Sequence, residues 1–107
     1  MTTVDDLVAT IAALQRSDIE TWIHEELVTP RQDAGVLLFN DMDCARIRLI
    51  CALHYELEID ADSLPVVLAL VDQLYDTRQR LLSLTAAVMA QDKGIQTAII
   101  DAIGRIE

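Results

Sequence analysis

Apolar residues recur every three or four positions through most of this chain, which is the spacing that one buried face of an α-helix produces. The first such stretch predicts a helix over residues 4–14. Thr3 followed by Asp6 resembles the polar pair that caps a helix N-terminus, so we expect this helix to begin directly after Thr3.

A second capped helix follows. Ser17 and Glu20 have the spacing of a capping box and predict a helix over residues 18–27. Trp22 lies at its centre, in helical register with Ile19. This register favours packing of the indole into the core, although tryptophan is also common as an exposed binding anchor.

Residues 28–40 interrupt the helical pattern with Pro30 and Gly35 and then supply a short apolar run, which predicts a small hairpin or wing. Asn40 is expected to cap a third helix over residues 41–57. This third helix is apolar on most sides, so we expect it to be largely buried at the centre of the fold.

The two cysteines, Cys44 and Cys51, lie on this third helix, roughly 10 Å apart at 1.5 Å per residue. That separation is too large for a disulfide, and it favours reduced thiols packed in the core. Cys51 with His54 could donate two zinc ligands, but no further ligands occur at a suitable spacing. We therefore expect no metal and no cofactor.

From Leu64 the pattern predicts one long helix, with Pro65 in its first turn, where proline is tolerated. A packing seam of alternating three- and four-residue steps runs along it, weakened by Arg78 and Thr85. The residues expected to form a dimer seam are Val67, Val71, Leu74, Leu81 and Val88. A parallel stripe is formed by Leu68, Tyr75, Leu82 and Met89, so more than one face is apolar and a homodimer is expected.

Gly94 is expected to end the long helix and separate it from a short amphipathic helix over residues 95–106. This last helix should pack against the long helix or against a second subunit. The chain therefore reads as a mostly α protein, with a front module over residues 1–62 and helices over residues 63–107 in one continuous domain.

The net charge of −10 is concentrated in the front module. Residues 1–62 hold thirteen acidic residues and four arginines, a net charge of −9, whereas residues 63–107 hold five acidic and four basic residues, a net charge of −1. Nucleic-acid affinity depends on basic side chains that displace counterions, so DNA binding is disfavoured. The acids either attract a basic protein surface or keep a hydrophobic protein soluble.

Signs of catalysis are lacking in the sequence. There is no glycine-rich phosphate loop or nucleophile elbow, and His24 beside two glutamates is typical of a solvated surface residue. We expect a protein that is not an enzyme. No run of about 18 apolar residues and no basic signal-peptide start occur, so a cytoplasmic location is expected.

The order of two helices, the stretch "LVTPRQDAGVLLFND", a third helix and a long helix resembles the winged helix-turn-helix module and dimer helix of the MerR family. In that family an arginine near the start of the second helix and another in the wing contact DNA. Here Glu20 stands at the first position and the wing reads "GVLLF", so the family's groove and phosphate contacts are missing.

Within that superfamily the chain is more similar to the chaperone-modulator (CbpM) family. The matching stretches are "LVTPR" (27–31), "LLFND" (37–41), "HYELEID" (54–60) and "LALVDQLYDTRQRL" (68–81). This resemblance implies a protein that binds the J-domain of CbpA, a DnaJ-like co-chaperone, and inhibits both its co-chaperone activity and its DNA binding. Because the J-domain helix that contacts DnaK is positively charged, a protein that competes for this helix is expected to be acidic.

The predicted J-domain contacts are acids of the second helix, the wing and the third-helix exit: Glu20, Glu25, Glu26, Asp33, Glu58, Asp60 and Asp62. Taken singly, each of these residues is more typical of an ordinary solvated acid. The alternatives are a MerR-type DNA-binding regulator that uses Arg16, Arg31, Arg46 and Arg48, and a structural dimer-forming subunit.

Overall fold

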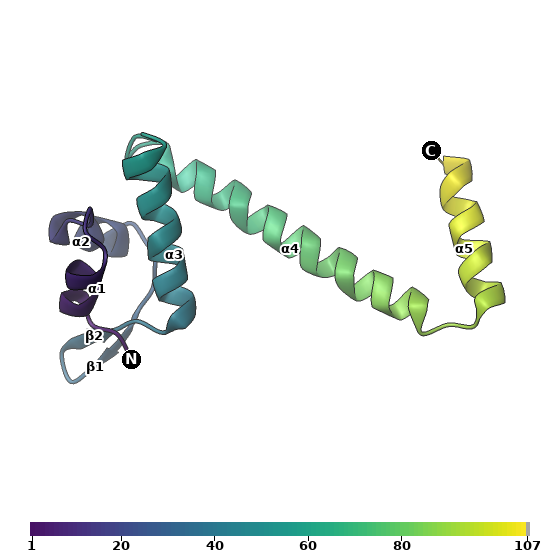
Figure 1. The fold of residues 1–107 in the computed structure, drawn as a ribbon, viewed down its shortest axis with the longest axis horizontal. Coiled ribbons are helices and arrows are strands. Elements are labelled where there is room, and N and C mark those ends of the chain that lie inside the picture. The colour runs from purple at the N-terminus through teal and green to yellow at the C-terminus, as the bar shows by residue number, and fades with distance from the viewer. Residues whose placement is uncertain (107) are drawn as a thin grey trace. The chain divides into compact units, whose positions relative to one another are not determined.

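The computed structural model describes residues 1–106 and is mostly helical (Figure 1). It divides the chain into two compact units, unit 1 over residues 1–68 and unit 2 from Ala69 onward. Helix α4 contributes its first turns to unit 1 and its remainder to unit 2.

Unit 1 contains two helices, a hairpin, and a third helix that continues into a short π-helix, in the order that the hydrophobic pattern predicts. The bounds are α1 Val4–Thr10, α2 Arg16–His24, β1 Arg31–Asp33, β2 Val36–Leu38, α3 Asp41–Cys51 and η1 Ala52–Glu56, followed by the start of α4 Leu64–Met89.

The predicted caps at Thr3 and Asn40 are confirmed, and each is part of a reciprocal capping box that begins α1 or α3. The Thr3 amide donates to the Asp6 carboxylate at 3.1 Å, and the Asp6 amide donates to the Thr3 hydroxyl at 3.2 Å. Asn40 and Asp43 repeat this arrangement at α3. The predicted extension of the first helix to residue 14 is wrong, because the backbone at Ile11 is extended and α1 ends at Thr10.

The predicted start of α2 is also wrong. The helix begins at Arg16, and its N-cap residue, Gln15, makes no side-chain capping bond. Ser17 therefore lies inside the helix, where its carbonyl accepts a hydrogen bond from the Thr21 hydroxyl at 3.0 Å. A side chain distant in the sequence stabilises this N-terminus in place of a local cap. The Tyr55 hydroxyl accepts a hydrogen bond from the Gln15 amide at 3.3 Å and donates one to the Asp18 carboxylate.

The predicted hairpin is confirmed. Strands β1 and β2 pair antiparallel with Arg31 opposite Leu38, and the turn residues Ala34 and Gly35 have φ values of 50° and 80°. Both central residues of a tight hairpin turn need this left-handed conformation, which glycine adopts most easily. Two backbone hydrogen bonds between Thr2 and Phe39 join the hairpin's exit to the start of the chain.

The hydrophobic core of unit 1 lies around α3, whose Cys44, Ile47, Ile50 and Cys51 are buried. The other buried hydrophobic residues are Leu7, Leu14, Ile19, Trp22, Leu27, Val28, Phe39, Leu53, Leu64 and Leu68. Trp22 thus packs inward as predicted. Burial of α3 is restricted to one side, since Met42 and Arg48 are exposed.

The third helix was predicted to continue to residue 57, but after Cys51 it widens into η1. The Leu57 amide donates to the Ala52 carbonyl at 3.0 Å, and the Ile59 amide donates to the Leu53 carbonyl at 2.9 Å. The Asp60 carboxylate then accepts from the Ser63 amide at 2.8 Å. This turn leads into α4, which begins at Leu64 with Pro65 in its first turn, as predicted.

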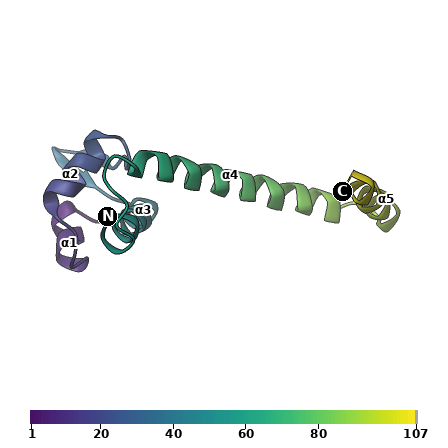
Figure 2. The same cartoon turned by 90° about the horizontal axis from the view of Figure 1, so that it is seen from above.

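Helix α4 runs without interruption through Leu64–Met89 (Figure 2), and helix α5 covers Lys93–Ile106. Gly94 does not separate the two helices, because it is the second residue of α5. The break lies at residues 90–92, where the Asp92 carboxylate accepts from the Ile95 amide at 2.9 Å and caps α5. None of the α5 residues is buried. Within residues 1–106 no helix is both long and apolar enough to cross a bilayer.

Replacing Tyr55 with phenylalanine should weaken the support of the α2 N-terminus. The Tyr55→Phe variant removes hydrogen bonds to Gln15 and Asp18, so we expect the free energy of unfolding in urea to fall by about 1–2 kcal/mol. Tyr75→Phe is the matched control, because Tyr75 is exposed on α4. An equal loss in both variants would contradict the role given to Tyr55.

The stability of unit 1 should also fall in alkaline solution. Burial, aided by nearby Asp18, raises the pKa of Cys51 from 9.0 to about 11 and the pKa of Tyr55 from 10.0 to about 12. The folded state then holds both protons more tightly, so this stabilisation is complete below pH 9 and is lost as pH rises from 9 to 12. Urea unfolding across this range should show the loss, with Tyr55→Phe losing less between pH 10 and 12.

Candidate acidic interface

The seven predicted contact acids are all exposed on unit 1. Glu20 lies on α2, Glu25 and Glu26 form its C-terminal turn, and Asp33 ends β1. The remaining three, Glu58, Asp60 and Asp62, lie between η1 and α4. The structure gives no hydrogen bond or ion pair within the described residues to the side chains of Glu20, Glu25, Glu26, Asp33, Glu58 and Asp62.

Helix α2 is held against η1 by an aromatic cluster. The Trp22 ring meets the His54 ring edge-on, with centroids 6.4 Å apart, and the Tyr55 ring lies 6.2 Å from it. The hydroxyl of Tyr55 also donates to Asp18 of α2. Because these contacts place α2 beside η1, the acids of α2 and those that follow η1 belong to neighbouring elements.

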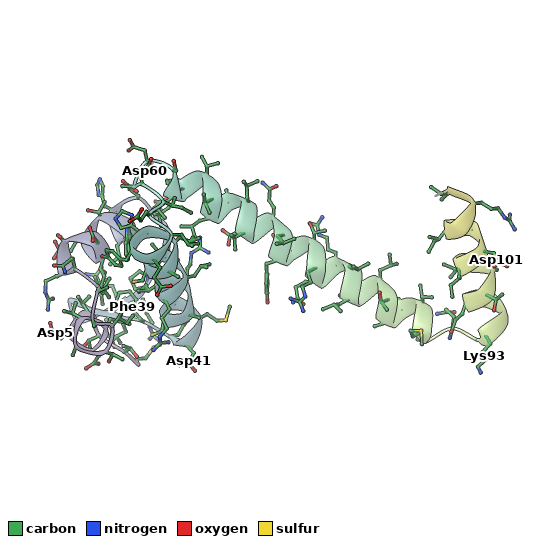
Figure 3. All side chains as sticks on the ribbon, turned by 45° about the horizontal axis from the view of Figure 1, so that its top comes forward. Asp5, Phe39, Asp41, Asp60, Lys93 and Asp101 are labelled. Carbon is green, nitrogen blue, oxygen red and sulfur yellow. The ribbon has the colours of Figure 1, made fainter. Side chains whose placement is uncertain are left out.

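Asp33 lies on the hairpin, away from the acids that follow η1. Its strand ends at the hairpin turn, and Gly35 and Val36 beside it line a shallow hollow together with Asp5 and with Arg16 of α2. Asp5 and Asp60 lie at opposite ends of unit 1 in Figure 3. The name "α2–η1 acidic surface" is used below for the remaining six: Glu20, Glu25, Glu26, Glu58, Asp60 and Asp62.

Two of these acids occupy backbone positions that favour glycine. Glu26 has a φ of 61° and follows α2, where the Leu27 amide donates to the Trp22 carbonyl and the Glu26 amide donates to the Ile23 carbonyl. This is the hydrogen-bond pattern of a Schellman C-cap, and Leu27 and Trp22 are both buried beneath it. Glu58, with a φ of 57°, follows η1 in a related turn.

Asp60 has a structural role as well as a charge. The hydrogen bonds from Ser63 hold the pKa of its carboxyl below the ordinary value of 3.8, because they favour the ionised form. Asp60 thus helps to order the turn before α4. It is therefore a poor position for testing charge alone.

Of the four arginines in unit 1, two are engaged in contacts within the unit. Arg16 forms an ion pair with Asp5, and half-buried Arg46 donates to the Leu27 carbonyl, which it reaches from α3. Arg31 and Arg48 are exposed on β1 and α3. Two of the four arginines of unit 1 thus make contacts that stabilise the unit itself.

Cys44 and Cys51 are both free and buried, which confirms the expected core thiols. His54 directs Nδ1 toward the Ile59 carbonyl at 2.7 Å, so this ring nitrogen already has a partner in the η1 exit. In the part of the chain that is described, no group of three or more histidine, cysteine or acidic residues could hold a metal ion.

Sequence reasoning missed an exposed leucine within the α2–η1 acidic surface. Leu57 lies between Glu56 and Glu58, and 67% of its surface is exposed. The helical pattern placed it on the continuous third helix, but the wider turn of η1 ends that register. No local signal in the sequence marks a π-helix at Ala52–Glu56.

Comparisons of the chain with protein-family models, curated proteins and solved structures each gave no match.

Glycine at position 26 should stabilise unit 1. A left-handed conformation costs an ordinary residue about 1–2 kcal/mol, and glycine's extra freedom in the unfolded chain offsets about 0.4–1 kcal/mol of that gain. Glu26→Gly should therefore raise the free energy of unfolding by about 0.5–1 kcal/mol in urea. Glu25→Gly is the control, because Glu25 has a φ of −82° and should gain nothing.

Proposed function

We propose that this chain is a non-enzymatic chaperone modulator of the CbpM type. It binds the J-domain of a DnaJ-like co-chaperone similar to CbpA and inhibits the co-chaperone and DNA-binding activities of that protein. The observation that carries this proposal is the α2–η1 acidic surface, where acids on two neighbouring elements are exposed, five of them without a side-chain partner.

The arrangement of unit 1 supports the comparison with a MerR-like winged helix-turn-helix. Two short helices, a two-stranded hairpin and a third helix follow one another in the order expected for that module. A net charge of −9 on such a scaffold repels phosphate and attracts a basic protein surface. The engagement of Arg16 and Arg46 within unit 1 further weakens the case for the DNA-reading alternative.

A protein interface needs a desolvated apolar centre as well as charge. Leu57 provides a candidate for that centre, because it is exposed and lies between two glutamates. A J-domain helix with lysine or arginine around an apolar position would meet this surface with complementary chemistry. The acids would then raise the association rate of the complex, and Leu57 would lower its dissociation rate.

Charge reversal on α2 should slow association with the cognate J-domain. In the Glu25→Lys, Glu26→Lys variant the on-rate should fall by about tenfold or more at low salt, because long-range attraction becomes repulsion. Stability should change by less than about 0.5 kcal/mol, since lysine replaces glutamate on the surface without altering the backbone requirement. The rates would be measured by surface plasmon resonance.

The control variant is Asp76→Lys, Asp101→Lys, which changes the net charge equally but places both substitutions in unit 2. This control variant should retain most of the on-rate for the J-domain.

The affinity of the unmodified chain for the J-domain should be micromolar or tighter. It should weaken as added salt shortens the screening length to about 8–10 Å. Equal on-rates for the α2 variant and the parent would remove α2 from the interface, and specific retardation of a DNA operator would favour the regulator instead.

A further inference from the structure

Both histidines of the chain lie at the α2–η1 acidic surface. His24 is the last residue of α2, directly before Glu25 and one helical turn after Glu20. His54 lies in η1, shortly before Asp60, and the sequence contains no other histidine. Histidine is the side chain that ordinarily changes its charge between about pH 5 and 8. A change of pH in this range therefore alters side-chain charge mainly at this surface.

His54 can accept a proton without leaving its position. Its Nδ1 lies 2.7 Å from the Ile59 carbonyl, and a carbonyl only accepts, so Nδ1 carries a hydrogen and donates. The second proton is then added at Nε2, and the bond to Ile59 is kept because both ring nitrogens of a charged imidazole are donors. The ring also packs against Trp22 and, at 5.2 Å between centroids, against Tyr55. The added charge is thus held at the junction of α2 and η1.

The charged groups around His54 are acidic. The titratable groups on the elements packed around it are Asp18 of α2, Cys51 of α3, Tyr55 and Glu56 of η1, and Asp60 of the turn that follows. Cys51 and Tyr55 stay neutral near pH 7, because their pKa values are about 11 and about 12. The hydrogen bonds with Ser63 lower the pKa of Asp60 most, and a positive charge on His54 lowers it further. His54 and Asp60 are therefore close enough for their charges to interact.

His24 lies in a similar environment at the other element. Glu20 precedes it by one turn, and Glu25 and Glu26 follow it in the chain. The basic side chain near this end of α2 is Arg46, which donates to the Leu27 carbonyl. A proton on His24 therefore places a positive charge among three of the six acids of the surface.

Two protons change the charge of the surface by a third. Its six ionised carboxylates carry −6, and one proton on each histidine leaves −6 + 2 = −4. The association rate of oppositely charged proteins depends on the charge of both surfaces. Acidification should therefore slow the association of this surface with a basic partner.

We propose that proton uptake by His24 and His54 regulates the α2–η1 acidic surface, so that it binds a basic partner well in mildly alkaline solution and poorly in mildly acidic solution. This inference rests on the proposed function, in which the basic partner is a J-domain. The direction follows from the sign of the charge, because each proton adds a positive charge to a surface that attracts cations.

The fluorescence of Trp22 reports the charge of His54 without any partner. Trp22 is the only tryptophan of the chain, its ring meets the His54 ring edge-on, and a charged imidazole beside an indole quenches its emission. The emission of the parent should fall in one transition as the pH is lowered from about 8 to 5.5. His54→Asn should lack the transition, and its amide can replace the Nδ1 donor. His24→Gln is the control and should keep it, because His24 is exposed at the end of α2.

Circular dichroism would verify that each variant is folded. Persistence of the transition in folded His54→Asn, or its absence in the parent, would remove His54 from the regulation and overturn the proposal.

Surface plasmon resonance with the J-domain measures the effect on binding. At low salt the on-rate of the parent should fall by about threefold to tenfold between about pH 8 and 5.5. The His24→Gln, His54→Asn double variant should show a smaller fall. Titration of the J-domain itself affects both chains equally, so the ratio of the two on-rates isolates the histidines.

His24→Lys imitates the protonated state of one histidine. At about pH 8 its on-rate should already be about twofold to threefold below that of the parent. Thr97→Lys is the matched control, because it adds the same charge at an exposed position of α5 in unit 2 and should leave the on-rate nearly unchanged. Equal losses in the two lysine variants would contradict a role for His24.

An equal pH dependence of the on-rate in the parent and in the double variant would overturn the proposal. Failure to bind the J-domain at any pH would instead refute the proposed function. Regulation of the surface would then be measured with an oligolysine peptide as the basic probe, by isothermal titration calorimetry. A smaller loss of oligolysine affinity on acidification in the double variant than in the parent would support the proposal, and an equal loss would overturn it.

Discussion

Repulsion among the thirteen acids of unit 1 is the constraint on which the proposed partner surface depends. It disfavours phosphate and favours a basic protein as the partner of the α2–η1 acidic surface. The same repulsion opposes contact between two copies of unit 1.

Aromatic contacts between α2 and η1 fix the positions of the elements that bear the acids of the α2–η1 acidic surface. Trp22, His54 and Tyr55 pack between α2 and η1, and the Tyr55 hydroxyl links both elements through Asp18 and Gln15. The charged residues above this cluster are therefore displayed on a fixed support. Glu26 and Glu58 lie at left-handed backbone positions where glycine is more stable, a local conflict of the kind that is found at functional surfaces.

Local signals predicted much of the fold. The capping pairs at Thr3 and Asn40 marked helix starts correctly, because the side chain and the amides that it caps are three residues apart. The pattern around Ser17 has the same form and failed, since the hydroxyl of a distant tyrosine supports that N-terminus. The seven candidate acids were proposed from charge and from the family resemblance, and their role stays a prediction. Leu57 was not proposed, because its exposure results from the widened turn of η1.

The sequence by itself determined the helical periodicity, the hairpin turn at Gly35, the buried thiols and the division of charge along the chain, because each depends on neighbouring residues or on composition. Tertiary structure decided which acids lie on neighbouring elements, that the hairpin with Asp33 lies away from the acids that follow η1, and that Arg16 and Arg46 are engaged within unit 1. These contacts join residues far apart in the chain. Their partners are selected by the packing of the whole core, which no local pattern encodes.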